Sequence, residues 1–92
     1  MGFTWDPGKA RGNLAKHGVD FADAVGVFED PRALTRDDPH PTEERYVTLG
    51  FDFLGRVVAV SWTWDQDDIR PISARRATPA ERRQYHAGEF DA

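Results

Sequence analysis

The sequence contains no cysteine, which excludes a disulfide framework, a thiolate metal site and a cysteine nucleophile. No apolar run approaches the ~18 residues that a membrane-spanning helix needs. The first residues have neither the basic region nor the apolar stretch of a signal peptide, and position 6 is not the Ser or Thr of a myristoylation signal. These absences predict a cytoplasmic protein that makes no contact with a membrane.

Common cofactor and nucleophile motifs are also missing. There is no P-loop, no GxGxxG, no GxSxG and no His/Asp cluster with metal-ligand spacing, so we expect neither a cofactor nor a metal. The three histidines are scattered. His40 lies in a proline-rich loop and His86 near a helix end, which is typical of surface residues. His17 adjoins Lys16, so it is either a partner of a helix dipole or a candidate general base.

With 92 residues, the chain has room for one domain, residues 1–92. Apolar residues make up 39% of it and aromatic residues 12%, which indicates a small folded core rather than a disordered chain. A core of this size stands little above the threshold of stability. We therefore expect a partner chain to cover part of the domain.

The net charge of -4 conceals strong segregation of charge along the chain. Residues 20–54 carry nine acids against three arginines, whereas residues 69–86 carry five arginines against Glu81. The acidic mean argues against indiscriminate coating of nucleic acid. A local arginine cluster can still bind phosphate, because charges are screened beyond ~8 Å in the cell. The alternative is an arginine-rich face that is merely solvated.

Capping signals, turn residues and apolar periodicity divide the chain into predicted elements, which are strand 3–5, helix 7–17, helix 20–29, strand 33–36, strand 44–51, strand 56–64, strand 69–76 and helix 78–87. Asp6 before Pro7 is a typical helix start, and Gly18 suits the left-handed residue that ends a helix. Consecutive strands after two helices predict an α+β fold, in which those helices pack on an antiparallel sheet of three to five strands and a C-terminal helix follows. Pro71 fits its strand only at a bulge or with its nitrogen facing away from a neighbour.

Several charged residues lie at the ends of predicted strands. Glu44 and Arg45 open strand 44–51 and point to opposite faces, either for function or to protect an edge from aggregation. Arg75 and Arg76 end strand 69–76 in the same alternating manner, so that only one of them faces a given site unless the chain bends. Trp62 and Trp64 share one face, either as core against the helices or as an exposed patch that marks an interface.

Several blocks resemble the BrnT toxin family, in the right order over nearly the whole chain. They are Phe3 to Asp6, Lys9, Asn13, Lys16 to Phe21, Ala24, Val27 and Phe28, Glu43 to Tyr46, Gly50, Ile72 to Ala77, Glu81 and Tyr85. The specific ones are K-H-G-V and I-S-A-R-R-A. The resemblance implies a type II toxin with a RelE-like fold that cuts RNA and inhibits translation. It also implies neutralisation by a BrnA-like antitoxin, which alone contacts DNA; a heterotetramer of two such pairs is the natural assembly.

The chemistry is compatible with a metal-independent endoribonuclease, in which a base deprotonates the 2′-OH, a cation stabilises the phosphorane and an acid protonates the leaving oxygen. We assign phosphate binding to Arg75 and Arg76, and acid or base catalysis to His17 with Lys16 supporting charge. Tyr85 would stack on a base or position the 2′-OH. Further candidates are Glu44 and Arg45 for catalysis, and Arg82 and Arg83 for binding RNA. The alternative is a non-catalytic binding module, such as a co-repressor acting with a DNA-binding partner.

Overall fold

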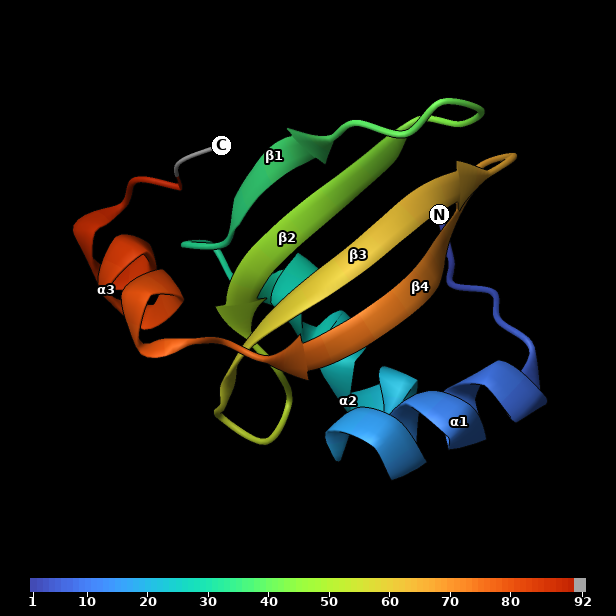
Figure 1. The fold of residues 1–92 in the computed structure, drawn as a ribbon, viewed down its shortest axis with the longest axis horizontal. Helices are drawn as coiled ribbons and strands as arrows, with labels where there is room; N and C mark the ends of the chain where they lie inside the picture. Colours follow the sequence, from blue (N-terminus) through green and yellow to red (C-terminus); the bar gives the residue numbers. More distant parts are fainter. Residues whose placement is uncertain (91–92) are drawn as a thin grey trace.

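The computed structural model describes residues 1–90 and shows an antiparallel sheet with helices on both faces (Figure 1). Its elements are α1 (Pro7–His17), α2 (Phe21–Ala24), the 3-10 helix η1 (Val25–Glu29), β1 (Leu34–Asp38), β2 (Arg45–Phe51), β3 (Val57–Asp65), β4 (Asp68–Arg76) and α3 (Pro79–Ala87). The strands are hydrogen-bonded in the order β1-β2-β3-β4. The predicted α+β class, with two helices before an antiparallel sheet and one after it, is confirmed. Residues 91–92 of the predicted domain lie outside the described part.

Helix α1 is bounded by the residues that its sequence predicts. The Asp6 carboxylate accepts the Lys9 N–H at 3.0 Å, and Gly18 ends the helix with φ 71° while its N–H binds the Leu14 carbonyl. Because Gly18 takes up a left-handed conformation at no steric cost, the chain reverses at once into α2.

The predicted helix 20–29 is one α-helical turn, α2, followed by the 3-10 turn η1. The turn between β2 and β3 packs against this segment, and the Phe53 N–H donates to the Asp23 carbonyl at 3.0 Å. An α-helix would use that carbonyl for the Val27 N–H. Gly26 lies so close to the turn that a Cβ there would be 2.5 Å from the Phe53 nitrogen. This tertiary contact explains why the α-helix stops at Ala24.

The predicted strand 3–5 is wrong, because only Phe3 forms an isolated parallel bridge, with Ile69. The Thr4 N–H binds the Ile69 carbonyl at 3.0 Å, and the Ile69 N–H binds the Gly2 carbonyl at 2.9 Å. The chain then turns away from β4, because Asp6 caps α1. This short contact covers one end of the outer edge of β4.

The two faces of the sheet have separate cores. Alternating residues of β3 explain this, since Val58 and Val60 pack against α1 and α2 whereas Val57 and Ala59 pack against α3. We call these the helical face and the α3 face. Pro71 lies where the β3–β4 register shifts, so of the two placements predicted for this proline the bulge is the one observed.

Helix α3 covers only one end of its face, while the β1–β2 loop and the β3–β4 turn come together at the opposite end (Figure 1). Trp62 is buried in the core on the helical face, which is the first of the two alternatives predicted for this pair. Trp64, whose ring contacts that of Trp62, is exposed. Among residues 1–90 no helix has the length and apolarity to cross a membrane.

Candidate functional site

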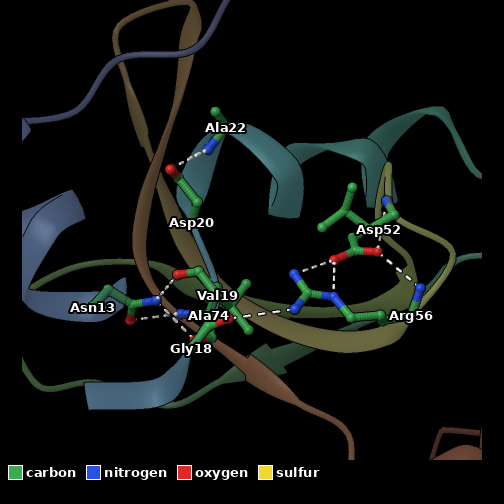
Figure 2. Close-up of polar contacts among 9 residues, drawn as sticks. Asn13, Gly18, Val19, Asp20, Ala22, Asp52, Arg56 and Ala74 are labelled. Carbon is green, nitrogen blue, oxygen red and sulfur yellow. Dashed lines mark hydrogen bonds and ion pairs between the residues drawn. The ribbon is translucent and has the colours of Figure 1, made fainter. Parts of the chain in front are cut away.

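The segment from Lys16 to Phe21, which joins the end of α1 to α2, is held to the rest of the fold at two points, which Figure 2 shows. The first is the buried side chain of Asn13. Its Nδ2 donates to the carbonyls of Val19 at 2.8 Å and Ala74 at 2.9 Å, and its Oδ1 accepts the Ala74 N–H at 3.1 Å. Asn13 thereby replaces a neighbouring strand at the outer edge of β4 and fixes the end of α1 to it.

The second point is an ion pair between Asp52 and Arg56 in the β2–β3 turn (Figure 2). The buried Asp52 carboxylate accepts Nε of Arg56 at 2.8 Å, and Nη1 of the same guanidinium donates to the Gly18 carbonyl at 3.3 Å. Both anchors flank Lys16 and His17. Lys16 is exposed and His17 is half-buried at this end of the helical face.

Most of the Lys16 to Phe21 block is therefore explained by folding. Gly18 has a positive φ, Val19 and Phe21 are buried in the core, and Asp20 caps α2 by accepting the Ala22 N–H. The same contacts do not explain Lys16, which is exposed, or His17, which is half-buried.

Arg75 and Arg76 lie on opposite faces of β4, as their alternation predicts. Arg75 pairs across the sheet with Ala59, whose side chain is on the α3 face, and Arg76 pairs with Val58, whose side chain is on the helical face. Arg76 is therefore at the same end and face as Arg56 and the Lys16–His17 segment. Arg75 belongs to the face that α3 covers in part.

Glu81 in the first turn of α3 holds the Arg75 guanidinium in a bidentate ion pair. Its two oxygens accept Nη1 at 2.7 Å and Nη2 at 3.0 Å, and it also accepts the Thr78 N–H in a capping box. The hydrogen bonds from Arg75 chiefly lower the pKa of Glu81, to about 2. The Arg75 side chain remains 43% exposed, so it can still contact a ligand.

A second ion-pair group lies farther along the same face. The Glu43 carboxylate is 2.6 Å from Nε of Arg45 and 3.6 Å from Nη2 of Arg70, so it joins β2 to β4. The hydrogen bond from Arg45, together with the nearby charges of Arg45, Arg70 and His40, lowers the pKa of Glu43. Arg36 of β1 pairs with Val47 and places its guanidinium 4.4 Å from the ring of Phe90 on this face.

The uncovered part of the α3 face thus carries arginines from three strands, namely Arg36, Arg45, Arg70 and Arg75. Half-buried Ser61 and Ser73 pair between them across β3 and β4. Carboxylates of Asp38, Glu43 and Glu81 lie among the arginines. We call this surface the arginine face.

A cavity of about 290 Å³ opens beside it at the β1–β2 loop. Asp38, His40, Glu43 and Arg45 are among its lining residues. The sequence had indicated a surface role for His40, but the loop brings it to the Glu43–Arg45 pair. The sequence did not predict a role for Glu43, Arg36 or Arg70. Their place beside Arg45 and Arg75 depends on how the strands pair, which the sequence does not show.

Tyr85, for which an RNA contact was predicted, is buried between α3 and the sheet. Its ring is buried edge-on against Phe51, and its hydroxyl donates to Asp30 at 2.6 Å. Burial and the Asp30 carboxylate raise the pKa of Tyr85 to about 12. Since Asp30 also accepts the N–H groups of Phe51 and Arg32, this contact connects α3 to the segment before β1 and to the end of β2.

The remaining predicted residues lie outside the arginine face proper. Glu44 is exposed and accepts the Tyr46 hydroxyl at 3.2 Å near the helical face. Arg82 donates to the Ala77 carbonyl at the base of α3, and Arg83 is exposed on that helix. The predicted catalytic set is therefore divided. Arg45 and Arg75 lie on the arginine face, and Lys16, His17 and Arg76 lie at one end of the helical face.

These features define a small α+β domain whose sheet carries arginines from three strands on one face. Residues 5–81 match the model of a family described as the ribonuclease toxin, BrnT, of type II toxin-antitoxin systems. The chain belongs to this family, and the resemblance indicated by its signature blocks is confirmed.

A solved structure supports the assignment. The chain is similar to the ribonuclease toxin BrnT of Brucella abortus, whose crystal structure has a resolution of 1.1 Å. The two chains are 29% identical and superpose with a TM-score of 0.65, over 85% of this chain and 97% of that one. No curated protein sequence matches the chain. A type II toxin family implies a protein antitoxin as partner.

Proposed function

We propose that this protein is an endoribonuclease toxin that cleaves RNA on the arginine face and thereby inhibits translation in the cytoplasm. The observation that carries the proposal is that Arg45 and Arg70 meet at Glu43 on the sheet face that also carries Arg75. Guanidinium groups offer forked donors that match phosphate oxygens, and Ser61 and Ser73 add hydroxyls between them. RNA rather than DNA is the substrate of the reaction, because the 2′-OH supplies the nucleophile.

The proposed chemistry is a transesterification in which Glu43 is the general base. Its carboxylate takes the proton of the 2′-OH, whose oxygen attacks the adjacent phosphorus. Arg45 and Arg70, which already contact Glu43, stabilise the negative charge of the phosphorane. The bond from phosphorus to the 5′ oxygen then breaks, and His40 in the adjoining cavity donates a proton to that oxygen. The products are a 2′,3′-cyclic phosphate and a 5′-hydroxyl.

Three arginines supply the positive charge that this reaction needs, so we propose that cleavage is independent of metal. Undiminished activity in a chelator such as EDTA is the expected result. Lys16, His17 and Arg76 form a separate candidate set at the end of the helical face. The variant His17→Gln tests that set, since it should leave cleavage unchanged if the reaction takes place on the arginine face.

The partner is proposed to be a BrnA-like antitoxin in a heterotetramer of two toxins and two antitoxins, with DNA bound only through the antitoxin. The motive is the family, together with the small core of a 92-residue chain. Co-purification at one antitoxin per toxin, with the mass of a heterotetramer, is expected. A toxin that stays monomeric beside its antitoxin would contradict this assembly.

Cleavage of a defined RNA by the purified protein tests the main proposal. Arg45→Ala, Arg70→Ala and Arg75→Ala should each lose about tenfold to hundredfold in rate, since a charged hydrogen bond contributes ~1.5–3 kcal/mol. Arg11→Ala is the matched control, because Arg11 is an exposed arginine on α1. RNA that stays intact during a clear growth arrest would overturn the nuclease proposal and leave toxicity standing.

One observation favours a second candidate function. Arg45 and Arg75 are already paired with carboxylates, as in a surface that orients arginines for binding alone. A non-catalytic module or co-repressor acting with a DNA-binding partner would use the face in that way. Binding of RNA or antitoxin without cleavage, by a protein whose Glu43→Gln variant behaves like wild type, is the result that selects this candidate.

A further inference from the structure

Five aromatic rings form a connected row on the helical face, at the end away from α3. We call Phe3, Phe28, Tyr46, Trp62 and Trp64 the aromatic row. Ring centroids are 5.7 Å apart between Phe3 and Phe28, and 5.3 Å between Phe28 and Trp62. Those of Tyr46 and Trp64 are 4.8 and 5.2 Å from that of Trp62. The rings are therefore connected through Trp62, which lies in the core, to Phe3 on one side and to Tyr46 and Trp64 on the other.

The two ends of this row are exposed to solvent. Trp64 is 45% exposed and Phe3 is 40% exposed, although both rings contact buried or half-buried members of the row. Ile69 lies between them, since it pairs with Trp64 in the sheet and with Phe3 in the parallel bridge. A single exposed aromatic ring is common on protein surfaces. Exposed rings that are in contact with the hydrophobic core and with one another's neighbours are typical of a protein–protein interface.

The surroundings of the row are acidic. Asp37 is exposed and pairs with Tyr46 in the sheet, Asp67 is exposed in the β3–β4 turn, and the Tyr46 hydroxyl donates to Glu44. Burial, the Glu44 carboxylate and the nearby charge of Asp37 raise the pKa of Tyr46. These acids lie in or beside the β1–β2 loop and the β3–β4 turn, which are at the same end of the sheet (Figure 1).

This combination of exposed rings and carboxylates selects one kind of occupant. Phosphate is repelled by the acids, so RNA does not fit. A symmetric contact with a second copy would place the acidic turns of both copies against each other, which costs free energy. A segment with apolar side chains flanked by Lys or Arg fits both properties, because it buries the rings and its cations face carboxylates and ring faces.

We propose that the antitoxin docks on the two exposed rings of the aromatic row, through an amphipathic cationic segment whose apolar side chains cover Trp64 and Phe3. The inference rests on the proposed function only in taking the antitoxin as the partner. The docking site lies on the opposite face from Arg45 and Arg75. Loss of docking should therefore weaken neutralisation without changing cleavage by the free toxin.

Titration of the purified antitoxin into the purified toxin tests the proposal. Trp64→Ala and Phe3→Ala should each weaken binding by about tenfold or more, as for aromatic residues at interface centres. The double variant Asp37→Lys with Asp67→Lys should also bind more weakly, and its affinity should change less between about 0.1 M and 0.5 M salt. Because Asp37 and Asp67 are exposed, this variant answers the question even if Trp64→Ala fails to fold.

Matched controls lie at the other end of the molecule. Leu54 is 62% exposed in the β2–β3 turn, and Glu89 is exposed after α3, so Leu54→Ala and Glu89→Lys should bind within about twofold of wild type. The proposal is overturned if the aromatic and charge variants bind like wild type, or if the controls weaken binding as much. It is also overturned if Trp64→Ala dissociates a dimer of toxin alone.

RNA cleavage by the free proteins keeps the two proposals separate. Wild type and Trp64→Ala should cleave at the same rate. If neither cleaves while Trp64→Ala still weakens antitoxin binding, the proposed function fails and the docking site stands.

Discussion

Arg75 and Glu81 share two hydrogen bonds, of 2.7 and 3.0 Å, across the junction between β4 and α3. Glu81 also closes the capping box with Thr78. One carboxylate thus starts the last helix and sets the direction of an arginine on the sheet. A change at Glu81 should affect both the stability of α3 and the orientation of Arg75.

The pair predicts a loss of stability in acid. The pKa of Glu81 is about 2 in the folded protein and ordinarily about 4.5, because Arg75 stabilises the carboxylate. A depressed pKa contributes stability that is complete above the unfolded value and is lost as the pH falls toward the folded value. Unfolding free energy should therefore decline between about pH 4.5 and pH 2. Denaturant titrations at several pH values measure this decline, and the unfolding free energy of Glu81→Gln should fall less with pH than that of wild type. Glu89→Gln is the control and should follow wild type. Parallel pH profiles for wild type and Glu81→Gln would contradict the prediction.

Asn13→Ala should destabilise the protein by about 2–4 kcal/mol. The variant loses three hydrogen bonds and leaves the backbone groups of Ala74 and the Val19 carbonyl unpaired in a buried place. Urea denaturation measures the change, and Lys9→Ala on the exposed side of the same helix should change stability by less than about 0.5 kcal/mol. Equal stability of Asn13→Ala and wild type would show that this anchor is dispensable.

Tyr85→Phe should lower stability by about 1.5–3 kcal/mol, because a hydrogen bond to the Asp30 carboxylate is lost while the ring stays in place. The rate of RNA cleavage per folded molecule should stay unchanged, since the ring is buried. Thermal unfolding and cleavage are measured on the same preparation. An inactive variant with unaltered melting would instead support the RNA contact predicted from sequence.

Two glycines should respond to alanine in opposite directions. Gly26→Ala places a Cβ 2.5 Å from the Phe53 backbone nitrogen, so α2, η1 or the β2–β3 turn must shift, at a cost of about 1–3 kcal/mol. Gly12 has open space around its Cβ position in α1, so Gly12→Ala should stabilise by about 0.5–1 kcal/mol. Melting temperatures of the two variants give the comparison, and a neutral Gly26→Ala would refute the close contact.

Local signals in the sequence predicted the element order because they depend on neighbours in the chain. The start of α1 at Asp6 and Pro7 and its end at Gly18 are of this kind. The predictions for residues 3–5 and 20–29 went wrong where a distant segment intervened. Ile69 takes one bridge from Phe3, and the turn at Phe53 ends α2.

The candidate site followed the same division. Alternation along β4 was enough to show that Arg75 and Arg76 face opposite sides. It could not show that Arg70 and Arg45 meet at Glu43, because that depends on the registers of β2, β3 and β4 together. Nor could it show that Tyr85 is committed to Asp30, which is 55 residues away.

The sequence by itself determined the helix caps, the α+β class, the opposite directions of neighbouring strand residues and the family signature, all of which are carried by residues close together in the chain. Only the tertiary structure decided which charges meet. The ion pairs of Arg70 with Glu43 and of Arg75 with Glu81 join residues from separate elements, and so does the ring contact of Phe28 with Trp62, so their distances depend on how those elements pack. The arginine face, the hydrogen bond from Tyr85 to Asp30 and the exposed rings of the aromatic row therefore exist only once the sheet has formed.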